Sequence, residues 1–576
     1  MKTIIKIGLI ASFLSIGNML FAGGHILLER SVRQHMPEGS VRQHMPTRSV
    51  RQHMPERSVR QYMPTRSVRQ HMPEGSVRQY MPTRSIRQHM PEGSVAHVSK
   101  VTTSSAKSSS AKPKRQMRGN MTLKYNILPG SVDTVGDMFL KGIVYKRLRS
   151  NTFLWDWTNE NEAKKRKTNK AWGLGGSLVY KTAVFNGWST TFAYYGSLNP
   201  DFFRMDSADV GFTKAGKDTF SRYKVKMGNG FGIQAIAQGF LEYNNGTIDI
   251  RAGRQLFESV FTKSNDTKMI PNSFDGITMS IKMSPKVKTR LAYFVKQKLR
   301  DHQNAHDLVT FKDEKGESWA NNDDSAIHKG LNYDAFFMAG ENLNHKMYLI
   351  DFNTKDIKNL NLTLSALSVP GIVQDFTIEA HYKIPLEKSG WIARPGIRYF
   401  VQQDDGGGAI AGDKNLKGKP LTGYAPGVIG SLDSSLINAR IDLKMPDKKG
   451  FFRVGYSFVD DKADIFAPWR GFPTGGFTRA MAQYNWYANT KTYMFRAVYK
   501  FTPKLKASVR YAIQDFDDNK PGVQADSDVI HLDIWYNFNK NLQMKTRVGI
   551  AKANIDNVSK QDVSYNEYRL EFNYLF

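Results

Sequence analysis

The sequence predicts an all-β protein, an 18-stranded antiparallel transmembrane β-barrel with a disordered N-terminal arm. Three observations support this fold class: an N-terminal export signal, many short segments in which apolar and polar residues alternate, and a regular alternation of long and short connections between them. Strands of a membrane barrel alternate in this way, so they do not raise the average hydropathy as a spanning helix does. No internal run approaches the ~20 apolar residues of a spanning helix, which excludes a helical membrane protein.

The composition narrows the possible chemistry. The chain has 576 residues, with 82 Lys and Arg against 52 Asp and Glu, a formal net charge of +30, and no cysteine. The lack of cysteine excludes disulfides, cysteine-bound zinc, iron–sulfur clusters and thiol catalysis. With 40% hydrophobic residues the chain as a whole does not have the composition of a disordered protein.

Residues 1–22 have the pattern of a secretory signal peptide. Lys2 and Lys6 precede an apolar stretch, 7–21, which ends at the small residue Ala22. A charged head, an apolar core and a small residue at the cleavage site are the features that the export machinery recognises. We therefore expect the mature protein to leave the cytoplasm, which argues against nucleic acid as the partner of its basic residues.

Residues 23–118 are predicted to form a disordered basic arm with 18 basic and 5 acidic residues, a net charge of +13. Within it, residues 31–93 are seven copies of a nonapeptide that begin with SVRQHMPEG, and each copy offers only Val or Ile and a Met as aliphatic residues. A nine-residue repeat with a Pro in every copy cannot build a shared core or a regular helix. Residues 99–118, rich in Ser, Lys and Ala, continue the arm as a linker to a barrel at 119–576.

The arm is expected to be dispensable for the folded part. Copper binding by its His and Met residues is an alternative, but flexible His–Met pairs lack the fixed geometry of a metal site, so no metal site is predicted. Deleting residues 25–98 should leave folding and conductance unchanged, and protease should remove these residues quickly from the native protein. A melting temperature of the truncated chain clearly below that of the full chain would contradict this expectation.

The rest of the chain divides into segments with the period-two alternation of β-strands. In the last segment, Tyr568, Leu570 and Phe572 alternate with Arg569 and Glu571. An even number of strands is usual for a single-chain bacterial barrel. The 18 predicted strands are 141–151, 171–183, 187–196, 232–243, 247–253, 275–284, 286–296, 347–353, 359–366, 375–384, 391–401, 434–445, 451–459, 491–501, 504–514, 527–538, 541–551 and 565–576.

The connections between these strands alternate between long and short. Long loops at one end and tight turns at the other are typical of outer-membrane barrels. The apolar segment 480–487 is assigned to a loop, because a further strand would break the even number. The long connections are 152–170, 197–231, 254–274, 297–346, 367–374, 402–433, 460–490, 515–526 and 552–564.

The residues that share the apolar phase of each strand decide between a membrane barrel and a soluble protein. Outside the first strand, whose phase is ambiguous, the apolar phase contains no Lys, Arg, Asp or Glu. A charge that faces lipid at mid-bilayer costs roughly 2–4 kcal/mol, so a barrel must exclude it. In a soluble β-sandwich, the alternative, the apolar faces would pack together and the charged faces would lie outside. The export signal, the terminal Phe576 and the alternating connections favour the barrel.

The opposite phase would line the lumen, and it contains more basic than acidic residues. Rows of Arg and Lys select anions, because these cations pair with carboxylate or phosphate oxygens. Some of them are expected to pair with neighbouring carboxylates instead, but the excess over acids leaves others available. The predicted pore-lining basic ladder is Arg251, Lys282, Arg290, Arg398, Arg440, Arg453, Arg496, Arg510 and Arg547, and further candidates are Lys288, Lys444, Lys500, Lys506, Lys545 and Arg569.

Five segments between about 120 and 576 resemble the OprD-type outer-membrane porins. They are MFLKGIVYKRLRSNTF (138–153), KAGKDTFSRY (214–223), AGRQLFESVFTKSNDTKMIPNSFDGITM (252–279), PWRGFPTGGFTRAMAQYNWYANTKTYMFRAVYKF (468–501) and YNEYRLEFNYLF (565–576). The resemblance implies a monomeric 18-stranded barrel that passes small solutes, with a basic ladder and an inward-folded third loop. It implies Asp266 and Lys268 as constriction residues of that loop, with Lys268 at a position where Arg is more usual. It also implies that barrel-assembly machinery recognises Phe576. The nonapeptide arm departs from the family.

The predicted function is passive diffusion of small hydrophilic, preferentially anionic, carboxylate-type solutes across the outer membrane of a Gram-negative bacterium. The alternative is a surface adhesin or structural barrel with a closed pore. No enzyme activity is predicted, because the chain has no G-x-S-x-G elbow and no His in a nucleophile context. The expected partners are solutes, outer-membrane lipid and the assembly machinery, with a monomer preferred over a trimer and no cofactor or metal.

Overall fold

The computed structural model describes residues 114–117, 123–164, 166–310, 327–481, 486–555 and 562–576. The predicted signal peptide and nonapeptide repeats lie outside the described residues. A two-stranded sheet, β1 (Arg115–Met117) and β2 (Leu123–Tyr125), comes first, and β1 occupies residues that were predicted as linker. No helix among the described residues is long and apolar enough to cross a membrane.

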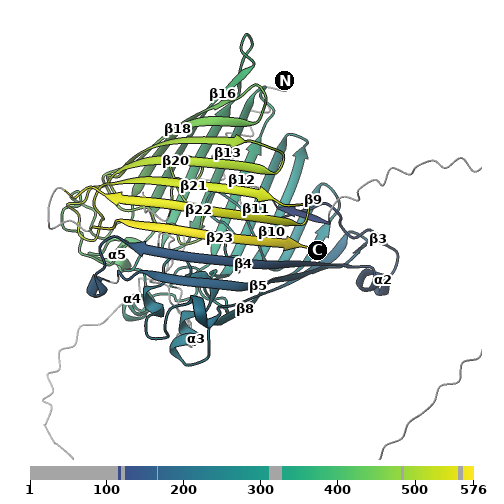
Figure 1. Ribbon diagram of the computed structural model, residues 1–576, viewed down its shortest axis with the longest axis horizontal. Helices are drawn as coiled ribbons and strands as arrows, with labels where there is room; N and C mark the ends of the chain where they lie inside the picture. The colour runs from purple at the N-terminus through teal and green to yellow at the C-terminus, as the bar shows by residue number, and fades with distance from the viewer. Residues whose placement is uncertain (1–113, 118–122, 165, 311–326, 482–485, 556–561) are drawn as a thin grey trace, which may run out of the picture. The chain divides into compact units, whose positions relative to one another are not determined.

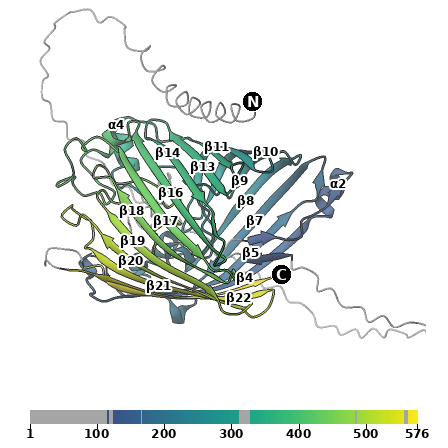
Figure 2. The ribbon, with the colours of Figure 1, turned by 90° about the horizontal axis from the view of Figure 1, so that it is seen from above.

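The described strands form a closed antiparallel barrel of 18 strands (Figures 1 and 2). Its strands are β4 (Ile143–Trp157), β5 (Asn169–Lys181), β7 (Trp188–Leu198), β8 (Gly232–Asn244), β9 (Ile248–Gln255), β10 (Ser273–Ser284), β11 (Val287–Lys298), β12 (Met347–Thr354), β13 (Leu360–Val369), β14 (Val373–Tyr382), β16 (Trp391–Asp404), β17 (Ser434–Lys444), β18 (Gly450–Val459), β19 (Lys491–Lys500), β20 (Leu505–Asp515), β21 (Ser527–Asn537), β22 (Leu542–Ala553) and β23 (Tyr565–Leu575). The predicted fold class and number of strands are thereby confirmed.

Short elements fill the connections. Helices α3, α4 and α5 belong to long connections and lie at one end of the strands, whereas α2 lies at the other end (Figure 1). The short elements are β3 (Ser131–Val132), α2 (Val135–Leu140), η1 (Glu162–Lys164), β6 (Val184–Phe185), η2 (Asp201–Phe203), η3 (Val210–Phe212), η4 (Lys217–Thr219), α3 (Arg222–Lys226), α4 (Tyr333–Ala339), β15 (Ile384–Leu386) and α5 (Gly407–Ala411).

The barrel closes by pairing of its last strand with its first. In the antiparallel pair of β23 and β4, Tyr565 lies opposite Trp157 and Leu575 lies opposite Arg147. Figure 1 shows the two strands side by side, β23 in yellow and β4 in blue. Closure removes the unpaired edges that an open sheet would expose.

The first strand is longer than predicted. β4 continues to Trp157, through residues predicted as a long loop. Its inward residues include Trp155, whose ring stacks on that of Tyr565 with centroids 3.8 Å apart and an interplanar angle of 17°. Arg147 and Arg149 also face inward and are buried. Because these inward positions mix aromatic with charged side chains, the sequence pattern left the phase of this strand ambiguous.

The outer surface of the wall is apolar and carries aromatic rings toward both ends of the strands. Tyr456 and Tyr493 lie near the long connections with ring centroids 5.1 Å apart, and Tyr348 is exposed at the same end of its strand. Near the short turns, Tyr499 contacts Phe501 with ring centroids 5.0 Å apart. Aromatic girdles at two levels around an apolar band mark the two interfaces of a membrane barrel.

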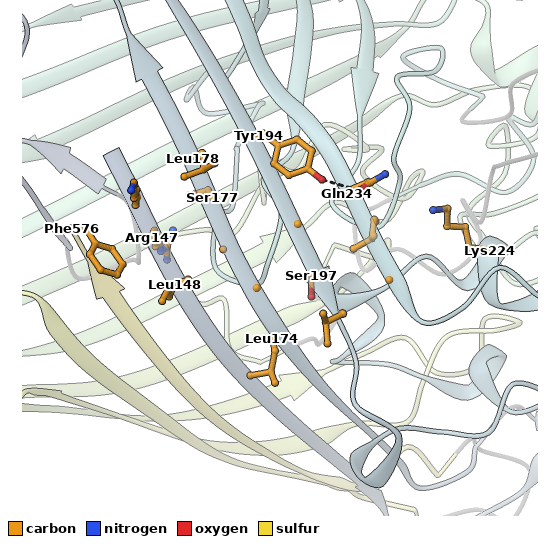
Figure 3. Close-up of a pocket in the computed structure, with 17 residues that line it drawn as sticks. Arg147, Leu148, Leu174, Ser177, Leu178, Tyr194, Ser197, Lys224, Gln234 and Phe576 are labelled. Atoms are coloured by element: carbon orange, nitrogen blue, oxygen red, sulfur yellow. Dashed lines mark hydrogen bonds between the residues drawn. The ribbon is translucent and has the colours of Figure 1, made fainter. Parts of the chain in front are cut away.

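A hollow of about 690 Å³ interrupts the outer wall over β4, β5, β7 and β8 (Figure 3). Gly176 of β5 and Gly196 of β7 are among the residues that line it. Leucine side chains line it, together with Tyr194, whose hydroxyl donates a hydrogen bond to Oε1 of Gln234 at 2.8 Å. Phe576 lies at its edge, so the last residue of the chain is part of the outer surface.

Deleting Phe576 should lower the amount of folded protein in the outer membrane. The backbone N–H of Phe576 donates to the carbonyl of Lys146 at 3.0 Å, and its ring contacts that of Tyr574 with centroids 4.6 Å apart. The deletion removes both contacts at the seam of the barrel, together with the terminal aromatic residue expected to be recognised during assembly. Quantifying the folded form in purified outer membranes checks this, with Phe576→Tyr as the control that keeps an aromatic terminus. Equal amounts in all three proteins would contradict it.

Several long connections fold into the barrel instead of standing above it. We name four of them L2 (199–231), L3 (256–272), L4 (299–346) and L7 (460–490). Apolar side chains of three of them, including Phe261 of L3, Leu308 of L4 and Trp469 of L7, join inward residues of the wall in one large buried cluster. This interior core fixes the loops that form the site described next. The apolar segment 480–487 was predicted as part of a loop. Its described residues, 480–481 and 486–487, form no strand, and residues 482–485 lie outside the described part of the chain.

Candidate functional site

Loops L3 and L7 are joined to each other inside the barrel. Thr262 and Arg470 form an antiparallel bridge, and the N–H of Gly471 donates to the carbonyl of Phe261 at 2.9 Å. A Cβ atom at position 471 would lie 2.1 Å from the carbonyl carbon of Phe261, so this approach requires glycine. The two loops therefore form one unit.

Three arginines of the wall hold the tip of L7. Nη1 of Arg398 donates to the carbonyl of Pro473 at 2.7 Å, and Nη1 of Arg453 donates to the carbonyl of Gly476 at 2.5 Å. Arg440 donates to the same carbonyl of Gly476. We predicted all three as pore-lining residues. The structure gives Arg398 and Arg440 the role of anchors for L7, whereas Arg453 is both an anchor and a lining residue of the cavity described below.

Asp266 has a different place from the one that the family resemblance implied. Its carboxylate pairs with Arg147 at 2.8 Å and with Arg149 at 2.6 Å, both on β4. Arg149 also pairs with Glu571 at 2.6 Å. Asp266 is buried in this cluster and does not line the cavity. It fixes L3 to the wall, and the two arginines that bind it were missed because the phase of β4 was ambiguous.

Lys268, the other predicted residue of L3, does line the cavity. Its ammonium group pairs with Asp218 of L2 at 2.5 Å, and Arg300 of L4 pairs with the same carboxylate at 3.2 Å. Burial alone would raise the pKa of Asp218, but the charges of Arg300 and Lys268 hold this pKa well below its ordinary value. A permanent anion at Asp218 thus joins L2, L3 and L4.

The loops and the wall enclose a cavity of about 550 Å³. Its lining includes eight arginines and three lysines but a single carboxylate, Asp533, so these charged side chains carry a formal net charge of +10 with His531 neutral. Apolar contacts come from aromatic residues, among them Phe477 and Trp535. The lining cations are Lys268, Arg300, Arg453, Arg470, Arg479, Arg496, Lys506, Arg510, Lys545, Arg547 and Arg569.

On the wall these cations form a belt across neighbouring strands. In register, Arg453 of β18 lies opposite Arg496 of β19, which lies opposite Arg510 of β20. Further along, Arg547 of β22 lies opposite Arg569 of β23. These arginines of the predicted ladder therefore lie side by side around the barrel.

The single carboxylate of the cavity serves several cations at once. Asp533 lies 3.0 Å from Arg547, 3.3 Å from Lys545 and 3.7 Å from Arg510. Nε2 of His531 also lies 3.0 Å from it. One anion cannot neutralise three cations, so positive charge remains at this part of the wall.

Two further wall cations have no carboxylate partner among the described residues. Nε of Arg496 donates to the hydroxyl of Ser508 at 3.0 Å. The ammonium group of Lys506 lies 4.4 Å from the centre of the Trp535 ring. A hydroxyl or an aromatic face orients a cation without cancelling its charge, so both side chains keep their positive charge in the cavity.

The other residues of the predicted ladder do not line the cavity. Arg251 pairs with Glu242 and Asp249, each at 3.0 Å, and Arg290 pairs with Asp351. Lys282 donates to the carbonyl of Gly246 at 2.8 Å, close to the short turns. These cations belong to local ion pairs or hydrogen bonds, and pairing of some ladder residues with neighbouring carboxylates was expected from the sequence.

The loop side of the cavity was not predicted from the sequence. Arg300, Arg470 and Arg479 line it from L4 and L7, opposite the strands of the wall. Arg479 lies over Phe472 and Trp486, with its guanidinium carbon 4.2 Å and 4.6 Å from the ring centres. The only sequence signal for these loop residues was the pairing of arginines with aromatic residues in 468–486. A loop has no periodic pattern, so the sequence does not show which way it folds.

The comparisons with solved structures agree with this architecture. OccK8 (OprE) of Pseudomonas aeruginosa matches with a TM-score of 0.57 and 14% identity, over 76% of this chain and 99% of that chain. The chain has the fold of the OprD/Occ porins. OccAB3 of Acinetobacter baumannii matches with a TM-score of 0.56 and 16% identity, over 76% of this chain and all of that one. No protein-family model and no curated protein matches the chain.

A third structure of the same fold contains a small molecule. OpdK of Pseudomonas aeruginosa, solved with vanillate, matches with a TM-score of 0.55 and 12% identity, over 76% of this chain and 99% of that chain. The family resemblance predicted from the sequence is thus confirmed at the level of the fold.

Among the described residues, no group of three or more His, Asp or Glu side chains is arranged to hold a metal ion.

The packing of L4 should weaken in acid. His306 and His328 are buried in this loop, and desolvation by burial lowers the pKa of His306 to about 3 and that of His328 to about 4. An opened loop has ordinary His pKa values near 6.5, so as the pH falls below about 6.5 the opened state gains protons first. The closed packing of L4 is therefore most stable above this pH. It loses stability as the pH falls from about 6.5 toward the pKa values of the two histidines in the folded protein.

Each such histidine should raise the opening equilibrium constant of L4 by about tenfold for each pH unit in that window. Limited proteolysis of the folded protein between pH 7 and pH 4.5 measures this opening. His306→Gln, which does not titrate, is the matched variant and should show a shallower pH dependence. A cleavage rate of the unaltered protein that does not change with pH would contradict the prediction.

Proposed function

We propose that this protein is an outer-membrane channel for passive diffusion of small hydrophilic solutes, with a preference for anions. The observation that carries the proposal is the cavity inside the barrel, with eight arginines and three lysines against one carboxylate. Rings of cationic side chains raise the local concentration of anions and offer them successive weak sites. The shared fold with the OprD/Occ porins supports a channel.

The outer surface supports a location in a membrane. Outward residues such as Val454, Phe495, Val509 and Ile530 form an apolar band, with aromatic rings toward both ends of the strands. The connections at one end are long except that between β13 and β14, and those at the other end are short, as in barrels of the Gram-negative outer membrane. The predicted long connection 367–374 is wrong, because β13 and β14 extend further than predicted and leave only residues 370–372 between them. We propose this location, insertion with the help of barrel-assembly machinery, and a monomeric state.

The solute class is proposed to include carboxylates. Guanidinium groups pair with carboxylates through two parallel hydrogen bonds, which makes arginine the preferred residue for such ligands. One OpdK structure of the same fold contains vanillate, which carries a carboxylate. The cavity volume of about 550 Å³ suits a small molecule.

Planar-bilayer recording of the purified barrel tests the channel. Stable open steps with a reversal potential that favours chloride over potassium are expected. A bilayer that stays silent after insertion of folded protein would refute the channel and favour the alternative, an adhesin or structural barrel. For that alternative, the long connections would be the binding surface. We propose no catalytic role for the cavity.

A further inference from the structure

The chain that precedes the barrel strands is held against the inner wall of the barrel. We name its described residues 114–117 and 123–127, which contain β1 and β2, the N-terminal segment. The backbone N–H of Asn126 donates to the carbonyl of Lys114 at 2.8 Å and extends the pairing of the two strands. This two-stranded sheet is separate from the barrel sheet, so side chains must hold it in place.

Arg115 of β1 anchors the N-terminal segment to the first barrel strand. Its side chain is buried, and its guanidinium group donates a hydrogen bond to the carbonyl of Lys146 on β4. The guanidinium carbon lies 5.4 Å from the centre of the Tyr145 ring and 5.8 Å from that of Tyr125. A hydrogen bond from a charged group and contact with aromatic rings both stabilise a buried cation. One side chain thus joins the segment to β4.

Two tyrosines place the segment on the inner side of the wall. Tyr145 is fully buried on the inward phase of β4, and its hydroxyl donates to the carbonyl of Ile127 at 2.7 Å. Tyr125 of β2 contacts the Tyr145 ring edge-on, with centroids 4.8 Å apart and an interplanar angle of 80°. The ammonium group of Lys181 on β5 lies 5.1 Å from the centre of the Tyr125 ring. The segment therefore contacts inward side chains of both strands.

The N-terminal segment lies beside L3. Tyr125 packs against an apolar cluster that contains Val179 of β5 and Met269 of L3. Tyr145 is close to the beginning of β4 and Lys181 is the last residue of β5, so the contacts of the segment fall near the short turns. The described residues that line the cavity include none of this segment, and those on the wall belong to β18 to β23. The segment thus occupies a part of the lumen outside the cavity.

We propose that the N-terminal segment forms a second constriction of the channel, between L3 and the short turns, with Arg115 as its anchor. Because the segment occupies the space against the inner face of β4 and β5, solutes that leave the cavity pass it on the side of β18 to β23. It therefore limits the width of the passage at this end of the barrel. This role rests on the proposed channel function and adds a pore element outside the cavity.

Replacement of the anchor in the full chain tests the constriction by single-channel recording in planar bilayers. Arg115→Gln loses the ring contacts and the charged hydrogen bond to the wall, so docking of the segment should weaken by about tenfold or more. Release of the segment widens the passage, and the variant should occupy a larger current level about tenfold more of the time than the unaltered protein. Lys124→Gln is the matched control, because it removes one exposed cation from β2 of the same segment and should change nothing.

Two deletions identify the larger current level. Deletion of residues 25–127 removes the N-terminal segment, whereas deletion of residues 25–98 keeps it. The longer deletion should show the larger level all the time, and the shorter one should match the unaltered protein. Heat-modifiable migration verifies that each protein folds, and Arg115→Gln in the full chain decides the test if the longer deletion does not fold.

Three outcomes would contradict the proposal. Equal conductance of the two folded deletion proteins would overturn the second constriction and leave the channel function standing. Identical recordings from folded Arg115→Gln and Lys124→Gln would overturn the role of Arg115 as the anchor. An unaltered, folded protein without any conductance would overturn the channel function, and with it this constriction.

Discussion

Val509→Arg or Leu532→Arg is expected to abolish assembly of the barrel. Both residues are on the outward phase, and they lie directly opposite each other on β20 and β21. Val509 is 45% exposed in the isolated barrel, where lipid would cover it. An arginine facing lipid at mid-bilayer costs roughly 2–4 kcal/mol. This is a large fraction of the 5–15 kcal/mol or so that stabilises a typical protein.

Heat-modifiable migration on a gel measures assembly directly, because a folded barrel runs differently from the boiled chain. Val509→Ile is the matched control, since it keeps an apolar side chain of similar shape at the same position. Folding of this control together with loss of the folded band in both arginine variants is the expected pattern. Normal migration of both arginine variants would show that the outward phase of these two strands is assigned wrongly.

The strands were predictable because one physical constraint acts on every one of them. Lipid on one side and a polar interior on the other impose a period of two, as Val509, Tyr511 and Ile513 show on β20. β4 follows this period of two less clearly, because its inward positions are not all polar. Its inward positions combine Tyr145 and Trp155 with two arginines, and Asp266 of L3 pairs with both arginines inside the barrel.

The wall side of the candidate site was predictable for the same reason. Arg496, Arg510 and Arg547 follow from the polar phase of their strands. Arg300 and Arg479 do not, because their positions depend on where L4 and L7 fold. That path is set by tertiary contacts, such as the bridge between L3 and L7 and the hydrogen bonds from wall arginines to the tip of L7. Such contacts join residues far apart in the sequence and leave no local pattern.

The difference between strand phase and tertiary contacts also explains why some residues of the predicted ladder line the cavity and others do not. Strand phase shows that a side chain faces the lumen, but it does not show what meets it there. Arg251 meets carboxylates on β8 and β9, and Arg398 meets Glu379 and the carbonyl of Pro473. The sequence therefore predicts the direction of an arginine more reliably than its freedom to bind a solute.

Replacing Arg496, Arg510 and Arg547 together by Gln should lower the occupancy of the channel by anions roughly eightfold and raise its occupancy by cations by a similar factor, so that its preference for anions over cations falls. A unit charge acting across about 10 Å of water contributes about 0.4 kcal/mol, so three contribute about 1.2 kcal/mol. A single replacement should change the selectivity little, because the neighbouring cations of the belt share the potential. Folding should be retained, since all three side chains face the lumen and glutamine keeps a polar group there.

Reversal potentials in a gradient of potassium chloride measure this preference. The triple Lys variant at the same positions keeps the charge and should keep the selectivity. Replacing the exposed turn lysines Lys286, Lys358 and Lys504 by Gln changes the net charge equally, outside the cavity, and should have no effect. Salt gives an independent check, because at 1 M the Debye length is about 3 Å and even the unaltered channel should lose selectivity. If the triple Gln variant and the unaltered protein give the same reversal potential at low salt, the belt of arginines is not the selectivity element.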